Sequence, residues 1–212
     1  AAPAGADLPG MSLFVTLEGP DGGGKSTQAS RLVDYLQGRD LNVLLTREPG
    51  GTLIGDQIRR TLMDLGNTGM HPRTEILLFS ASRAQIVHQV IRPHLESGGI
   101  VVCDRFYDST LAYQGYGHGL DLQALQTITA FATGGLRPDL TLLLDIARET
   151  AARRKQTGRD RFERDLPMLS RVRESYRRQA LRHHWIVIDG EQSKDDVEAA
   201  VGRTVLPRLA QP

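Results

Sequence analysis

Residues Gly19 to Ser26 follow the spacing G-x-x-x-x-G-K-[ST], the pattern of a loop that wraps around the phosphates of a nucleotide. Its glycines let backbone N–H groups approach phosphate oxygens without clashes from Cβ atoms. Lys25 would reach the β- and γ-phosphates, and the Ser26 hydroxyl would ligate Mg²⁺. An apolar run over residues 13–17 predicts a strand before the loop, and residues 28–36 follow with helical spacing. The alternative is a Gly-rich turn that carries Lys and Ser by chance. Because a strand before the loop and a helix after it are both predicted, we expect this loop to bind a nucleoside triphosphate.

Two acidic residues come directly after apolar strands farther along the chain. Asp104 follows residues 100–103, and Asp145 follows residues 140–144. In an open parallel sheet, ligands lie beyond the carboxyl ends of the strands, and an acid placed there is typical of a group that holds Mg²⁺. We favour Asp104 for this role, because the neighbouring Arg105 could clamp a phosphate with its planar, permanently charged guanidinium. For Asp145 we favour a helix cap or a solvated strand end.

A dense basic segment, residues 153–161, contains four arginines and one lysine. One interpretation is a lid, over about residues 153–163, whose arginines stabilise the charge on a phosphoryl group in transfer. The alternative is a solvated helix end with salt bridges, since the acidic residues Glu163 and Asp165 follow directly. The phosphate loop in the same chain favours the lid.

The elements that must position these residues alternate along the chain. Apolar runs predict strands over 13–17, 41–45, 100–103, 140–144 and 185–188, and the segments between them predict helices over 28–36, 53–65, 72–96, 108–114 and 121–133. This alternation is typical of an α/β fold, a five-stranded parallel sheet covered by helices on both faces. Continuous hydrophobicity within the strands predicts burial on both faces. We expect one domain over residues 11–212.

Composition sets further limits on what the chain can be. With 40% hydrophobic and 24% charged residues and a net charge of +1, the chain has neither the composition of a disordered protein nor a general nucleic-acid-binding charge. The one cysteine, Cys103, excludes an internal disulfide and is expected to act as a small buried hydrophobe. We expect no membrane span, no signal peptide and a cytoplasmic location. Residues 1–10 are small and Pro-rich, as in a disordered extension or a remnant of cloning.

Five blocks of this sequence resemble the bacterial type of the thymidylate kinase family. They are residues 14–27, 46–52, 77–83, 104–109 and 112–117, and the resemblance covers most of the chain after Met11. It implies the P-loop NTPase fold with a short lid, and phosphoryl transfer from ATP to dTMP that gives dTDP. It also implies Mg²⁺ as cofactor, small nucleotides rather than nucleic acid or membrane as partners, and a homodimer.

The resemblance implies roles for individual residues of this chain. The residues expected to bind ATP are Gly19, Asp21, Gly22, Gly23, Gly24, Lys25, Ser26, Thr27 and Arg154. The residues expected to bind dTMP are Asp21, Glu48, Arg59, Phe79, Arg83, Arg105, Thr110, Tyr113 and Gln114, with Arg47 on the same side. The catalytic residues are Lys25, Asp104, Arg105 and Arg159, and the metal ligands are Ser26 and Asp104. Phe79 would stack on thymine, Arg83 would bond a pyrimidine carbonyl, Tyr113 would crowd C2′ and Asp21 would bind the 3′-hydroxyl.

Position 22 distinguishes two subtypes of the family that this sequence resembles. Some members carry an arginine in the phosphate loop where this chain has Gly22, and those members have a glycine-rich lid. Here the arginines crowd the lid segment, so we expect Arg159 to contact the transferring phosphoryl group and Arg154 to lie near the donor. Three alternatives stay open: a deoxynucleoside (thymidine) kinase, another nucleoside monophosphate kinase, and a nucleotide-binding switch. The switch lacks support because the chain has no Asn-Lys-x-Asp segment for reading guanine.

Overall fold

A computed structural model describes residues 12–154 and 166–209 of the chain. These residues form one parallel sheet in the order β2-β3-β1-β4-β5, built from β1 (Leu13–Glu18), β2 (Val43–Arg47), β3 (Ile100–Asp104), β4 (Leu140–Asp145) and β5 (Ile186–Asp189). The prediction of an α/β fold with a five-stranded parallel sheet is confirmed. Residues 1–10 lie outside the described part of the chain.

The helices in the described ranges connect the strands in the expected alternation. They are α1 (Lys25–Gln37), α2 (Leu53–Met63), α3 (Pro72–Ile86), α4 (Arg92–Glu96), α5 (Tyr107–Thr110), α6 (Leu122–Thr133), α7 (Arg148–Arg154), α8 (Leu166–His183) and α9 (Lys194–Leu209). Two π-helical segments, η1 (Val87–Ile91) and η2 (Leu111–Gly117), continue α3 and α5. No helix of the described ranges has the length and apolar character needed to cross a membrane.

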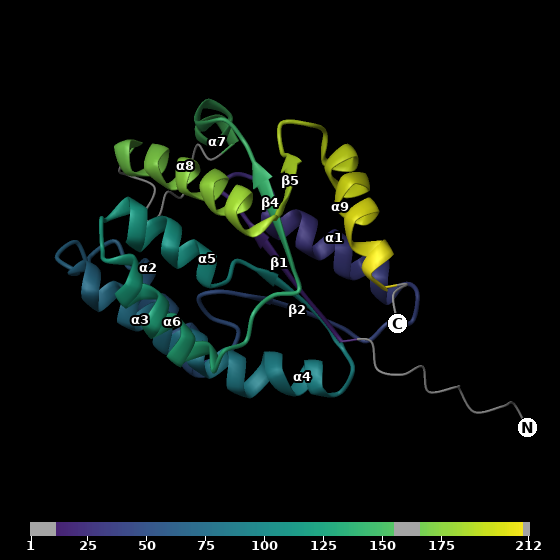
Figure 1. The fold of residues 1–212 in the computed structure, drawn as a ribbon, viewed down its shortest axis with the longest axis horizontal. Helices are drawn as coiled ribbons and strands as arrows, with labels where there is room; N and C mark the ends of the chain where they lie inside the picture. The colour runs from purple at the N-terminus through teal and green to yellow at the C-terminus, as the bar shows by residue number, and fades with distance from the viewer. Residues whose placement is uncertain (1–11, 155–165, 210–212) are drawn as a thin grey trace, which may run out of the picture.

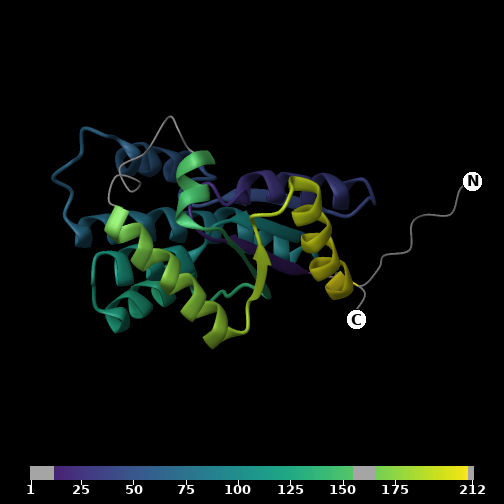
Figure 2. The same ribbon diagram turned by 90° about the horizontal axis from the view of Figure 1, so that it is seen from above.

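The sheet is covered on both faces, as Figures 1 and 2 show. Alternate residues of β1 point to opposite faces: Leu13, Val15 and Leu17 pack with α1 and α9, whereas Phe14 packs with α3, η1 and β3. A third cluster joins η2 to α8 over β4. All six residues of β1 are buried, so the central strand has the burial on both faces that its continuous hydrophobicity predicted.

The carboxyl ends of the central strands meet at one edge of the sheet. Leu17 of β1 and Arg47 of β2 both pair in register with Asp104 of β3. The phosphate loop leaves β1 at this edge and enters α1 at Lys25, three residues earlier than the helix predicted from residue 28. The fold therefore brings the loop, Asp104 and Arg105 together.

Further details of the elements differ from the predictions. The strand predicted at 41–45 lies at Val43–Arg47. Val187 of β5 is 54% exposed, because β5 lies at the edge of the sheet that the described residues form. The helix predicted over 72–96 widens at η1 just before Pro93, whose ring lacks an N–H and would clash with the carbonyl of Gln89 in a regular helix. Helix α9 was not predicted, because its buried stripe consists of three valines only, with Gly202 and Pro207 between and after them.

Gly19 follows β1 directly and has a conformation that only glycine adopts readily, with φ at +137°. A Cβ atom there would overlap the carbonyl oxygen of Leu144 on β4. We predict that Gly19→Ala lowers the free energy of unfolding by about 2 kcal/mol or more, since the clash adds to backbone strain. Gly69→Ala is the control, because a Cβ atom at Gly69 meets nothing within 4 Å. Urea unfolding measures both variants, and equal stabilities for the two would contradict this packing.

Candidate active site

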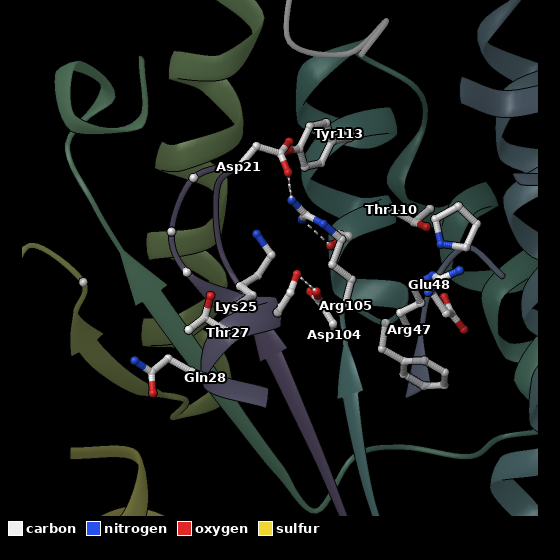
Figure 3. A pocket seen from close by; sticks show the side chains of 18 of the residues that line it. Asp21, Lys25, Thr27, Gln28, Arg47, Glu48, Asp104, Arg105, Thr110 and Tyr113 are labelled. Atoms are coloured by element: carbon white, nitrogen blue, oxygen red, sulfur yellow. Dashed lines mark hydrogen bonds and ion pairs between the residues drawn. The ribbon is translucent and has the colours of Figure 1, made fainter. Parts of the chain in front are cut away.

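A cavity of about 730 Å³ lies at the carboxyl edge of the sheet. Its walls come from the phosphate loop, the segments that follow β2 and β3, and the helical segments α3 and η2. Figure 3 shows Asp21, Lys25, Asp104 and Arg105 converging in its centre. One continuous cavity therefore joins the phosphate loop to the residues expected to hold a pyrimidine.

The phosphate loop has the backbone geometry that its glycines predicted. Gly22 and Gly24 have φ values of +81° and +86°, and a Cβ atom at Gly22 would approach the carbonyl oxygen of Ala151 on α7 to 3.1 Å. A side chain at position 22 would therefore need both a strained backbone and a small shift of α7. Lys25 donates a hydrogen bond of 2.8 Å to the carbonyl of Pro20. Burial lowers the pKa of Lys25 to about 8, and the anionic phosphates of a ligand would raise it again.

Ser26 and Asp104 meet at the base of the loop. The Ser26 hydroxyl donates a hydrogen bond to Asp104 Oδ2, and the buried Oδ1 of Asp104 has no hydrogen-bond partner among residues 12–154 and 166–209. Mg²⁺ prefers oxygen ligands and is commonly bound through one or two protein groups together with substrate phosphates. The Ser26 hydroxyl and the Asp104 carboxylate, with its Oδ1 available, fit that requirement. The described residues contain no cluster of three or more His, Cys, Asp or Glu that could hold a metal by themselves.

Arg105 occupies the centre of the cavity in a strained conformation, with φ at +70°. Its Nη2 lies 2.6 Å from Asp21 Oδ1. Its Nη1 donates to Ser109 Oγ at 3.0 Å and to the hydroxyl of Tyr176 at 2.9 Å. Tyr113 donates to the other oxygen of Asp21 at 2.8 Å. The guanidinium is thus aimed at the phosphate loop by partners from three different segments.

Behind Arg105 lies the fully buried carboxylate of Glu18, at the end of β1. It accepts hydrogen bonds from the backbone N–H of Phe106 at 2.8 Å, from Ser109 at 2.6 Å and from Tyr176 at 3.2 Å. Burial raises the pKa of Glu18, against the opposing attraction of Arg105. Since Ser109 and Tyr176 also accept from Arg105, Glu18 fixes their orientation and through them the position of the guanidinium.

The other end of the cavity is built around Arg83 on α3, which is 1% exposed. Its Nε donates to Glu48 Oε2 at 2.8 Å, and its Nη2 donates to Thr110 Oγ1 at 3.0 Å. Its Nη1 has no hydrogen-bond partner among the described residues. Burial raises the pKa of Glu48 to about 7, and Arg83 partly offsets this. Phe79, one helical turn before Arg83, lines the same end of the cavity.

Nearly all of the residues proposed from the sequence line this one cavity. They are Asp21, Gly22, Gly23, Gly24, Lys25, Ser26, Thr27, Arg47, Glu48, Arg59, Phe79, Arg83, Asp104, Arg105, Thr110, Tyr113, Gln114 and Arg154. Arg59 donates to the carbonyl of Pro49 at 2.8 Å, and Arg154 lies 3.4 Å from the carbonyl of Gly22. Gly19 does not line the cavity but packs against β4. Arg159 and most of the predicted lid lie outside the described residues.

The structure corrects the interpretation of Asp145 as a solvated strand end or helix cap. Its side chain is only 13% exposed and forms ion pairs with Arg173 and Arg177 of α8, at 2.9 and 2.7 Å. It does not line the cavity, so the choice of Asp104 over Asp145 agrees with the geometry. Cys103 is buried, as predicted.

Sequence reasoning missed several residues of the site. Glu18 is an acid directly after an apolar strand, the same signal that identified Asp104, and could have been found. Tyr176 lies four residues from both Val172 and Ala180 on one helix, so its pattern was that of a core residue. The cavity also extends to Gln28, Gly190, Gln192, Lys194 and Val197, most of which belong to or precede the unpredicted helix α9.

The cavity contains a phosphate loop with a buried lysine and an acid that bonds to the loop serine. Its other end is rich in arginine. These features define a P-loop kinase of small nucleotides. The family model described as thymidylate kinase matches residues 17–201. The chain belongs to the thymidylate kinase family.

Individual relatives agree over nearly the whole length. A thymidylate kinase of Roseiflexus castenholzii is 52% identical over 218 aligned residues, which cover 94% of this chain and 95% of the relative. A thymidylate kinase of Exiguobacterium sp. is 46% identical over 206 residues, with 94% and 96% covered. The crystal structure of thymidylate kinase from Ehrlichia chaffeensis superposes with a TM-score of 0.76 at 32% identity, covering 92% of this chain and 99% of that one.

The contacts of Tyr176 predict that its hydroxyl contributes to the stability of the fold. Tyr176→Phe would keep the buried ring but remove one hydrogen-bond partner from both Glu18 and Arg105. We predict a loss of about 1–3 kcal/mol in the free energy of unfolding, because a buried charged group is left with fewer partners. Chemical denaturation measures the change. Tyr107→Phe, at a tyrosine outside this network, is the control, and an unchanged stability for Tyr176→Phe would contradict the role of the network.

Proposed function

We propose that this chain transfers the γ-phosphoryl group of Mg·ATP to the phosphate of dTMP through the residues of this cavity. Its family membership gives the reaction, the phosphorylation of dTMP to dTDP. The observation that carries the residue roles is the position of Arg105 and Asp21, between the phosphate loop and the Arg83 end of one cavity. Two nucleotides bound at these ends would have their phosphates in the middle.

The donor end would hold ATP by its phosphates. Backbone N–H groups of the glycine loop, the N-terminus of α1 and Lys25 supply positive potential at one place. Ser26 and Asp104 would hold Mg²⁺, which supplies electrostatic stabilisation of the charge on the β- and γ-phosphates when bound. Thr27 lines the same end, and Arg154 approaches the loop from α7.

The acceptor phosphate would lie against Arg105, with Arg59 nearby. Asp21 is a carboxylate among phosphate sites, and the 2.6 Å ion pair with Arg105 makes that placement tolerable. In the bound state Asp21 would accept from the 3′-hydroxyl of dTMP while Arg105 turns to the phosphate. The acceptor is already an oxyanion, so alignment and charge neutralisation suffice and the reaction requires no general base.

The pyrimidine would lie on Phe79 and be read by Arg83. Arg83 Nη1 has no partner within residues 12–154 and 166–209 and is a donor suited to a ring carbonyl, and Glu48 and Thr110 hold the rest of the guanidinium. Tyr113, tied to Asp21, would crowd C2′ of the sugar and so disfavour ribonucleotides. These contacts support dTMP over thymidine, because the arginines Arg59 and Arg105 would have no phosphate to bind in a nucleoside.

The reaction is tested by ADP release in the presence of Mg·ATP and separate acceptors. We predict turnover that strongly favours dTMP over UMP, AMP, GMP and thymidine, with little ADP release when no acceptor is present, because lid closure excludes water. Turnover of thymidine in place of dTMP would point to a deoxynucleoside kinase. ATP binding without acceptor-dependent turnover would leave only a nucleotide-binding switch.

The lid segment would supply the arginine that the loop lacks at position 22. We predict that Arg159→Ala lowers kcat by roughly 10²-fold or more, as the loss of a charge-stabilising donor does. Arg203→Ala, at an exposed arginine of α9, is the control and should leave kcat unchanged. A variant of Arg159 with the kcat of the unaltered protein would contradict the lid assignment.

We further propose that residues 11–212 form a single kinase domain that acts as a cytoplasmic homodimer. The support for the dimer is a set of exposed apolar side chains on helices that pack beside one another: Leu53 and Ile54 on α2, Leu77 on α3 and Phe131 on α6. Phe131 is 89% exposed, and exposed apolar groups of this size on neighbouring helices are typical of a protein interface.

The dimer is tested by charge substitution on this surface. We predict that Leu77→Asp combined with Phe131→Asp converts a dimer to a monomer in light scattering, because two carboxylates would be buried without partners. Leu181→Asp on α8, at a leucine that is 81% exposed, is the control and should leave the mass unchanged. A monomeric unaltered protein, or a dimer that survives the double substitution, would contradict this interface.

A further inference from the structure

Glu75 is a buried carboxylate in the first turn of α3. The roles proposed above for phosphate binding and for Arg83 do not involve it. It is 1% exposed. Its Oε1 accepts a hydrogen bond from Gln114 Nε2 at 2.7 Å and lies 3.3 Å from Nε2 of His118. Gln114 is itself 1% exposed and lines the cavity near Phe79 and Thr110. Glu75 therefore stands directly behind a side chain of the pyrimidine end.

The chemistry of this pair fixes the orientation of the Gln114 amide. The amide turns its NH₂ group toward Glu75, and this is the orientation that an ionised carboxylate requires, since such a group only accepts hydrogen bonds. The carbonyl oxygen, Oε1, then lies on the other side of the amide from the bond to Glu75, and Gln114 lines the cavity. Rotating the amide by half a turn would face two acceptors against each other in a buried place, which is unfavourable. Gln114 thus presents an acceptor to the cavity.

Arg83 presents a donor at the same end of the cavity. Its Nη1 has no partner among the described residues, while Glu48 and Thr110 hold its other nitrogens. Thymine and uracil carry a carbonyl acceptor at C4 beside an N3–H donor. These two groups complement the donor of Arg83 and the acceptor of Gln114. Cytosine carries an amino donor at C4 beside an unprotonated N3 acceptor, so both contacts would be repulsive. The two side chains form a pattern that distinguishes these bases.

We propose that Glu75 is a positioning residue that holds the Gln114 amide with its carbonyl oxygen toward N3–H of the pyrimidine, so that the site accepts thymine or uracil and rejects cytosine. The proposal rests on the proposed function, because it takes the Arg83 end of the cavity as the pyrimidine site. Buried polar groups that are left unpaired by the wrong ligand give strong discrimination, larger than apolar contacts do.

The first test replaces the carboxylate by an amide, Glu75→Gln. The new side chain can donate as well as accept, so the Gln114 amide is free to present either group to the base. We predict that the ratio of kcat/KM for dTMP to kcat/KM for dCMP falls at least tenfold, through a higher KM for dTMP. A general loss of activity would lower both values and leave the ratio unchanged, and that result overturns the proposal. Glu96→Gln, at an exposed glutamate of α4, is the matched control.

The second test uses the 3-deaza analogue of dTMP, in which a C–H group replaces N3–H. We predict that the unaltered protein uses this analogue at least tenfold less efficiently than dTMP, and that the difference shrinks in Glu75→Gln. Equal use of dTMP and the analogue by the unaltered protein would overturn the proposal even if Glu75→Gln failed to fold. Glu75→Asp gives a further comparison, because it keeps the buried charge but draws the oxygen back from Gln114.

These outcomes are separable from those that test the proposed function. An unaltered protein that does not phosphorylate dTMP contradicts the proposed function itself. An unaltered protein that phosphorylates dTMP, together with an unchanged base preference in Glu75→Gln, contradicts the role of Glu75 alone.

Discussion

The site depends on one buried carboxylate, Glu18, at the end of the central strand. A carboxylate buried at the end of an apolar strand is costly unless hydrogen bonds surround it, and three donors from two other parts of the chain do so here. Satisfying Glu18 draws in the backbone of Phe106, which follows β3, and the hydroxyl of Tyr176 on α8. The same hydroxyl and that of Ser109 then aim Arg105 at the phosphate loop. The strained φ of Arg105 persists because its neighbours determine its position on every side.

The same device recurs at the other end of the cavity. Glu48 bonds to Arg83, and Glu75 bonds to Gln114, so that a buried carboxylate holds each of these two polar side chains. Groups fixed in this way lose little conformational freedom when a ligand binds, so more of the interaction free energy remains for affinity and alignment. A kinase that must align two phosphates in line gains most from such rigidity, since small displacements lower the rate steeply.

The parts of this structure that were predicted from the sequence are those set by local patterns. The phosphate loop, the apolar strands and Asp104 each have a signal within a few residues, and the fold brings Lys25, Ser26 and Asp104 together as expected. The networks behind them were not predicted, because Glu18 and Tyr176 are 158 residues apart and their contact arises only from the packing of α8 over the sheet. Helix α9 was missed because three valines and a Gly-containing segment resemble a loop as much as a helix. The ion pairs of Asp145 are likewise tertiary contacts without a local signal.

A crystal structure with dTMP and a non-hydrolysable ATP analogue would test the central claim most directly, since it places both nucleotides against these side chains. We predict that N3 of the thymine lies at a hydrogen-bonding distance, about 2.7–3.2 Å, from Gln114 Oε1. In the same complex the acceptor phosphate should contact Arg105, and its oxygen should face the γ-phosphate above Lys25. A thymine bound away from Phe79 and Gln114, or an Arg105 that stays on Asp21 while the acceptor phosphate binds elsewhere, would contradict the arrangement of the two substrates.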